Sequence, residues 1–289
     1  MKFWQSLAFT EPEQLTQVAP ICEEVGFEGA FVSDHIFFLE QFEKNYPYNE
    51  TGDPGFTAET PWPQPWVTIA SMAAVTTKLR FSTLIYILPL HDPIEVAKAT
   101  GTLAVLSDNR FALGVGAGWM REEFDIMGAS FKGRGKCLDE GMEVCRKLWS
   151  GGMVEHSGDA YSFPALQMSP APSEPVPIWV GGVSDLALRR AATLGDGWLG
   201  SGQTADEALA MLGTIQKYRK EAGRQNEPFE AVVPLVSEPD PDVYRRLEDA
   251  GATATVSYPF MYALGPVSSL DQKRGYLEGF ASSVIETMG

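Results

Sequence analysis

Asp34 and His35 end one short apolar run, Gly29–His35, and are the residues best suited to proton chemistry. An imidazole exchanges a proton near neutral pH, and a carboxylate beside it could orient the ring or accept a hydrogen bond from a ligand. We therefore expect His35 to manage a proton with Asp34 next to it, although the ring could instead bond only to backbone. His91 lies in the turn after a later strand and could simply be solvated.

Alternating glycines mark a second strand end, where Phe111–Val115 continues into Gly116, Gly118 and Trp119. Because Trp119 occupies the place of the last glycine, the stretch does not match the dinucleotide fingerprint G-x-G-x-x-G. Glycine costs stability inside a strand, so we expect these glycines to let the backbone approach a bound ring or phosphate. Glu123 and its acidic neighbour then open a helix, where a negative charge suits the dipole, and we interpret both as structural.

A third strand end carries Gly181, Gly182 and Ser184 directly before a helix. The spare N–H groups and partial positive charge of a helix N-terminus make a ready seat for a phosphate. The alternative is an ordinary serine cap after a tight turn. Two glycine-rich strand ends in one chain favour a phosphorylated ligand.

Alternating strands and helices must position these strand ends, and such alternation predicts parallel strands with helical crossovers. About eight units in 289 residues favour an α/β fold of the (β/α)8 TIM-barrel type, formed by residues 1–289 as a single domain. The expected strands are Phe3–Phe9, Gly29–His35, Leu79–Leu88, Phe111–Val115, Val176–Gly182, Gly195–Gly202, Phe229–Val236 and Ala252–Phe260. The expected helices are 11–26, Val67–Thr76, Ile94–Leu106, Lys136–Trp149, Asp185–Leu194, Asp206–Ala222, Asp242–Ala250 and Leu270–Thr287, besides the short acidic one after Trp119.

Two insertions interrupt this alternation. Ile36–Pro65 follows the second strand, is rich in aromatic residues, proline and glycine, and is long enough to suggest a lid over an apolar substrate. Gly151–Pro175 comes after the fourth strand and its helix, and we predict that it has no regular secondary structure.

Composition excludes several classes of function. The net charge of -16 makes nucleic acid and anionic membranes poor partners. The three cysteines have no short spacing, which argues against a disulfide framework. The histidines are scattered along the chain, which argues against a metal site. We see neither a signal peptide nor an apolar run of the ~20 residues that span a bilayer, so we expect a cytoplasmic protein.

The stretches RFALGVGAGWMREEFDIMG and PIWVGGVSDLALRRAATLGDGWLG together resemble the luciferase-like monooxygenase superfamily, over essentially the whole chain. YPYNETG followed by ETPWPQPWVTIA is similar to a subfamily of probable coenzyme F420 (deazaflavin) oxidoreductases. The resemblance implies a barrel that holds FMN or the deazaflavin at its C-terminal mouth.

The resemblance also assigns roles to residues of this chain. Asp34 and His35 match the Asp-His pair near the cofactor ring, where the histidine is a proposed proton-transfer residue. Leu84 and Ile85 fall where the family places a non-proline cis peptide against the ring. The remaining implied cofactor-binding residues are Gly116, Gly118 and Trp119 at one strand end and Gly181, Gly182 and Ser184 at the phosphate-binding turn.

Two departures concern the fine mechanism. Trp119 stands where some deazaflavin dehydrogenases carry a glutamate acid, and Leu84 stands where the family often has a small residue. The anionic tail of a deazaflavin would need basic residues, which Arg121, Lys132 and Arg134 could supply unless they form a solvated loop.

Three functions therefore remain open. The first is hydride transfer between coenzyme F420 and a small-molecule substrate. The second is an oxygen-dependent monooxygenase that uses FMN and needs a partner reductase to supply the reduced cofactor. The third is a barrel that binds a flavin-like ligand without turnover. Dimers are usual among relatives, so we expect a homodimer by analogy.

Overall fold

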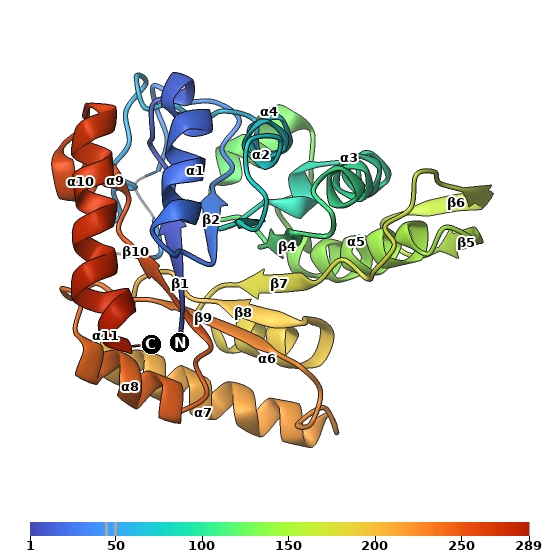
Figure 1. The fold of residues 1–289 in the computed structure, drawn as a ribbon. Coiled ribbons are helices and arrows are strands. Elements are labelled where there is room, and N and C mark those ends of the chain that lie inside the picture. Colours follow the sequence, from blue (N-terminus) through green and yellow to red (C-terminus); the bar gives the residue numbers. More distant parts are fainter. Residues whose placement is uncertain (44–45, 49–50, 289) are drawn as a thin grey trace.

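The computed structural model describes residues 1–43, 46–48 and 51–288, and its central feature is a closed barrel of eight parallel strands (Figure 1). Around the barrel each strand pairs with its neighbour in the order β1, β2, β3, β4, β7, β8, β9 and β10, and β10 pairs with β1 again. The barrel strands are β1 (Lys2–Ser6), β2 (Gly29–Val32), β3 (Arg80–Thr83), β4 (Phe111–Val115), β7 (Ile178–Gly181), β8 (Gly197–Leu199), β9 (Glu230–Pro234) and β10 (Ala254–Ser257). The predicted (β/α)8 TIM barrel is therefore confirmed.

Helices cover the outside of the barrel, and their apolar faces pack against the strands (Figure 1). The helices are α1 (Leu15–Glu24), α2 (Pro65–Ala73), α3 (Pro93–Leu106), α4 (Arg121–Met127), α5 (Arg134–Trp149), α6 (Asp185–Leu194), α7 (Ala205–Glu221), α8 (Pro241–Asp249), α9 (Phe260–Leu264), α10 (Leu270–Phe280) and α11 (Glu286–Met288). Short 3-10 turns at Pro12–Gln14 and Leu88–Leu90 and a π-helical turn at Ala281–Ile285 complete the elements. The π-helical turn divides the long closing helix that the sequence predicted.

The largest error in the predicted strands is the third, expected at Leu79–Leu88 but ending at Thr83. Beyond Thr83 the regular strand is interrupted, but the Leu84 amide still donates to the Val32 carbonyl, and Tyr86 donates to the Gly114 carbonyl and forms an isolated parallel bridge with Val115. Apolar residues continue across this boundary because the segment is buried, so hydrophobicity alone could not show where pairing stops.

The insertion Gly151–Pro175 is not irregular, which corrects the prediction. It forms an antiparallel hairpin of β5 (Met153–Ser157) and β6 (Ser162–Gln167), which projects beside α5, away from the barrel (Figure 1). Pro164 obscured this strand in the sequence, because proline cannot donate to a ladder. Among the described residues, β6 pairs only with β5. The other edge of β6 forms no ladder with any of them, so a proline, which lacks an N–H group, is tolerated there.

Large aromatic side chains fill the interior of the barrel. The rings of Trp4 and Phe31 lie 4.5 Å apart, and those of Trp4 and Trp179 lie 5.5 Å apart. Leu84 and Ile85 pack on top of this cluster. The barrel is therefore solid below its mouth, and any ligand must bind above these two residues.

Candidate active site

A cavity of about 1390 Å³ opens at the carboxyl-terminal ends of the barrel strands, where TIM-barrel enzymes carry their active sites. It exceeds the roughly 300–1,000 Å³ of a pocket for one small ligand, so it has room for a cofactor together with a substrate. Nine of the ten residues predicted for the site line it: Asp34, His35, Leu84, Ile85, Gly118, Trp119, Gly181, Gly182 and Ser184.

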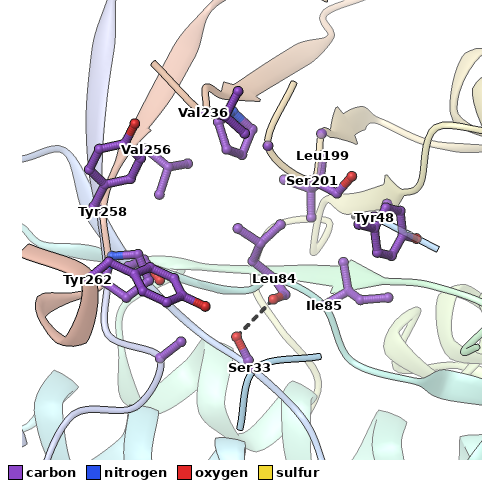
Figure 2. A pocket seen from close by; sticks show the side chains of 18 of the residues that line it. Ser33, Tyr48, Leu84, Ile85, Leu199, Ser201, Val236, Val256, Tyr258 and Tyr262 are labelled. Carbon is purple, nitrogen blue, oxygen red and sulfur yellow. Dashed lines mark hydrogen bonds between the residues drawn. The ribbon is translucent and has the colours of Figure 1, made fainter. Parts of the chain in front are cut away.

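Leu84 and Ile85 form the floor of the cavity and are joined by a cis peptide bond, as the resemblance implies. The Ser33 hydroxyl donates a hydrogen bond of 2.9 Å to the Leu84 carbonyl, drawn as a dashed line in Figure 2. Both side chains rest on the core of the barrel. They present a fixed aliphatic surface on which a flat ring could lie.

Asp34 does not orient His35, which corrects the predicted pairing. Its Oδ2 atom accepts hydrogen bonds from the Ile87 amide at 3.1 Å and from His91 Nε2 at 3.2 Å. Both residues follow the end of β2 at Val32, and each side chain turns to a different partner. Asp34 instead holds the segment that follows the cis peptide, and His91, which stacks on Tyr86 at 4.3 Å, helps to fix it there.

His35 has a different partner, Glu123, which comes from the first turn of α4. Its Nδ1 atom lies 3.0 Å from Glu123 Oε1, and the same oxygen accepts a 3.2 Å hydrogen bond from the Ile36 amide. The Glu123 side chain is completely buried, and its Oε2 atom has no hydrogen-bond partner among the described residues. A buried carboxylate placed in this way fixes the ring and stabilises a positive charge on it.

The sequence analysis interpreted Glu123 as structural and so missed this contact. Its position in the first turn of the helix after a barrel strand was the available signal, since that turn borders the barrel mouth.

Aromatic rings surround His35 on the cavity side. The centroids of Trp62, Phe56 and Trp119 lie 4.7, 4.9 and 6.2 Å from the imidazole. Tyr46 extends this wall through a contact of 5.2 Å with Trp119. His35 thus sits in a chamber from which aromatic rings exclude much of the solvent.

Gly114 of β4 and Gly116, which follows it, make room for the adjacent chain segment rather than for a ligand directly. A Cβ atom on Gly114 would lie 1.8 Å from the Thr83 carbonyl oxygen, and one on Gly116 would lie 1.9 Å from Ile85 Cδ1. Gly116 is the predicted site residue that does not line the cavity. Its role is to make room for Ile85, while Gly118 and Trp119 form the wall.

The start of α6, where Ser184 caps the helix by accepting from the Ala187 amide, is a candidate anion site, and we call it the anion seat. Arg134 and Arg190 line the cavity at the same end. Arg134 donates through Nε to the Gly118 carbonyl at 3.0 Å and through Nη1 to the Phe131 carbonyl at 3.3 Å. Burial and the nearby Arg121 lower the pKa of Arg134, so a bound anion would relieve the repulsion.

The basic residues of this seat were predicted only in part. Of Arg121, Lys132 and Arg134, only Arg134 lines the cavity. Arg190 was missed, although it lies on the helix that begins at Ser184. It is held by Asp139 and by the Gly135 carbonyl at 3.2 Å.

The loop Ile36–Pro65 contributes Tyr46, Tyr48, Phe56 and Trp62 to the cavity wall. Residues 44–45 and 49–50 of the predicted lid lie outside the described part of the chain. Phe38 packs on Phe56 at 6.1 Å and is not among the residues that line the cavity. The loop therefore covers the chamber of His35, as a lid would.

No group of three potential metal ligands occurs among the described residues. His156 lies in the hairpin between Glu140 and Lys147, at 3.0 Å from each. It connects β5 to α5 and does not take part in the cavity. None of the helices in residues 1–43, 46–48 and 51–288 has the length and apolar character that a bilayer span requires.

Comparison with known sequences agrees with this geometry. The profile of the luciferase-like monooxygenase family matches residues 4–275. The chain belongs to this family. Its members include oxidoreductases and monooxygenases, and the chain is of that general kind.

Two relatives are informative. The "Uncharacterized protein Rv0940c" of Mycobacterium tuberculosis is 37% identical over 287 residues, which are 99% of each chain. An "F420-dependent glucose-6-phosphate dehydrogenase" of Segniliparus rotundus is 26% identical and matches 82% of this chain and 68% of its own length.

Two solved structures share the fold. An "F420-dependent secondary alcohol dehydrogenase in complex with an F420-acetone adduct" superposes with a TM-score of 0.79 at 17% identity, covering 100% of this chain and 99% of the other. The monooxygenase RslO1 from Streptomyces bottropensis gives a TM-score of 0.76 at 18% identity, covering 100% of both chains. The predicted luciferase-like barrel is thus confirmed.

Proposed function

We propose that the protein is an oxidoreductase that transfers a hydride between coenzyme F420 and a small organic substrate. The observation that carries the proposal is the pair of His35 and Glu123, which places a fixed proton carrier in the cavity above the Leu84–Ile85 floor. The names of the glucose-6-phosphate dehydrogenase and the secondary alcohol dehydrogenase support coenzyme F420 as the cofactor.

The residues of the cavity fit such a cofactor. The N-terminus of α6 together with Arg134 and Arg190 would hold a phosphate. Leu84 and Ile85 would support a flat ring from below. When bound, the deazaflavin would supply hydride chemistry, which no amino-acid side chain provides.

The chain itself supplies the proton and the environment. His35 donates through Nδ1 to Glu123, so in the neutral ring Nε2 is free to accept a proton from a substrate hydroxyl. Glu123 stabilises the charge that His35 then carries. In the reverse direction His35 returns the proton to a carbonyl oxygen as that carbon is reduced. Trp62 and Trp119 exclude water from this step.

Reduced FMN acting with oxygen is the second candidate. The two arginines and the N-terminus of α6 suit the single phosphate of FMN as well as that of a deazaflavin. The monooxygenase name of RslO1 gives this candidate its support. The two candidate functions differ in how the cofactor reacts with oxygen, because a deazaflavin reacts poorly with it.

The test is a titration of the protein with coenzyme F420 and, separately, with FMN, followed by tryptophan quenching. We expect micromolar binding of coenzyme F420 and weak binding of FMN. Arg190→Ala should weaken binding about 10- to 150-fold, since a hydrogen bond to a charged group contributes ~1.5–3 kcal/mol. Arg189→Ala is the matched control, because Arg189 pairs with Glu221 outside the cavity. Preference for FMN would favour the monooxygenase, and binding of neither cofactor would refute the proposed function.

A further inference from the structure

The two ends of the cavity differ in chemistry. The anion seat lies at β4 and β7, which are neighbours in the barrel. Phe9, Tyr258 and Tyr262 line the cavity beyond β1 and β10. In the closed order of eight strands, β10 and β1 stand across the barrel from β4 and β7. A cofactor phosphate at the anion seat therefore leaves the opposite end for another molecule.

The opposite end is built from aromatic rings. Phe9 lies 5.2 Å from Trp62 and 5.9 Å from Tyr262, in edge-to-face geometry. Figure 2 shows Leu84 of the cavity floor between Tyr262 on one side and Tyr48 on the other. We call Phe9, Trp62, Tyr258 and Tyr262 the aromatic end. Rings in this arrangement present both faces and edges to a bound ring.

The charges of the lining divide in the same way. Among the described residues that line the cavity, Arg134 and Arg190 are the cationic side chains of Lys or Arg type, and both belong to the anion seat. Asp53, which precedes Trp62 in the chain, and Glu238, which follows β9, line the cavity and are both acidic. Burial raises the pKa of Tyr258 and of Tyr262 above its ordinary value. The phenols are therefore neutral hydrogen-bond donors.

We propose that the aromatic end binds a neutral, ring-bearing organic molecule and rejects phosphorylated or carboxylated ones. That this molecule is the substrate rests on the proposed function. Its ring would stack among Phe9, Trp62 and Tyr262, and its oxygen would face His35, whose imidazole lies 4.7 Å from Trp62. An anionic substrate would lose its water there, and among the described lining residues no Lys or Arg lies at that end to pair with it. The specificity thus differs from that named for the relative that acts on glucose 6-phosphate.

The test compares two probes with one ring system, 2-acetylnaphthalene, which is neutral, and 2-naphthoate, which carries a carboxylate. Calorimetric titration requires neither cofactor nor turnover, so its outcome is separate from that of the cofactor titration. It uses the Arg134→Ala/Arg190→Ala double variant as well as the wild type, because the carboxylate could occupy the anion seat.

In the double variant we expect the neutral probe to bind at least about tenfold more tightly than 2-naphthoate, a difference of ~1.4 kcal/mol. Trp62→Ala should weaken the neutral probe about tenfold or more in the wild-type background, because the ring loses a stacking partner. Equal or tighter binding of 2-naphthoate in the double variant, or no effect of Trp62→Ala, would overturn the proposal.

A gain of binding provides a second test. Tyr262 is 61% exposed, so Tyr262→Lys places a cation at the aromatic end without disturbing the core. We expect it to raise the affinity for 2-naphthoate and to lower that for 2-acetylnaphthalene. Val267→Lys is the matched control, because Val267 is 80% exposed, lies in the same region of the chain and does not line the cavity. If both lysine variants bind 2-naphthoate equally, the aromatic end does not select the charge.

Discussion

Glu123→Gln tests the central feature of the site, because it removes one charge from the partner of His35 and keeps the size of the side chain. Glu123 is completely buried and lies 3.0 Å from His35 Nδ1. A hydrogen bond to a charged group contributes ~1.5–3 kcal/mol, and ~1.4 kcal/mol in a barrier changes a rate tenfold. We therefore expect kcat to fall about 10- to 150-fold. KM should change little, since Glu123 is not among the residues that line the cavity.

The assay is turnover of the deazaflavin with a neutral ketone or alcohol, followed by its absorbance, with a melting curve to verify folding. Asp125→Asn is the matched control, because it removes the same charge from the same helix at an exposed position. If the two variants had the same kcat, Glu123 would not act through His35. A rise in KM with kcat unchanged would equally refute the argument, because it would place Glu123 in substrate binding.

Three further predictions concern stability and protonation. Gly116→Ala should lower the free energy of unfolding by about 1–3 kcal/mol, because its Cβ would lie 1.9 Å from Ile85 Cδ1; denaturant titration measures this. Burial would raise the pKa of Glu23, but backbone N–H donors outweigh it and lower the pKa from 4.5 to about 2. Glu23 should therefore stabilise the fold fully above pH 4.5, and this stabilisation should be lost as the pH falls toward 2. Glu23→Gln should flatten the acid limb, which is the fall in stability at low pH. His35 should carry its neutral-ring proton on Nδ1, bonded to Glu123, which nitrogen NMR detects without any ligand.

Each of these predictions has a control in the same chain. Gly275→Ala should not destabilise the protein, because its Cβ would meet open space within a helix. Glu13→Gln should leave the acid limb unchanged, since Glu13 is exposed and its carboxylate has no partner among the described residues. His91 and His156 should both carry the proton on Nε2, facing Asp34 and Glu140. An Nδ1 proton on all three rings would contradict the hydrogen bonds described here.

The amino-acid sequence alone determined most of the barrel elements and the general location of the site. Alternating apolar runs and amphipathic stretches predicted the barrel, because a parallel strand needs a helix to return the chain. β4 and α6 were placed to the residue, since glycine and a serine cap mark their ends. Nine of the ten residues predicted for the site, some from local signals and others from the family resemblance alone, line the cavity, because every barrel strand delivers its last residues to one mouth.

Only the tertiary structure decided which of these residues act together. His35 and Glu123 are 88 residues apart in sequence, and Asp34 is bound to His91 rather than to its own neighbour. Arg190 and Arg134 come from different helices, and only the folded barrel brings both to the same cavity. Sequence patterns report which side of a strand or helix is apolar, but closing the barrel sets which strand ends face each other. That closure separates the anion seat from the aromatic end and gives the buried carboxylate of Glu123 its imidazole.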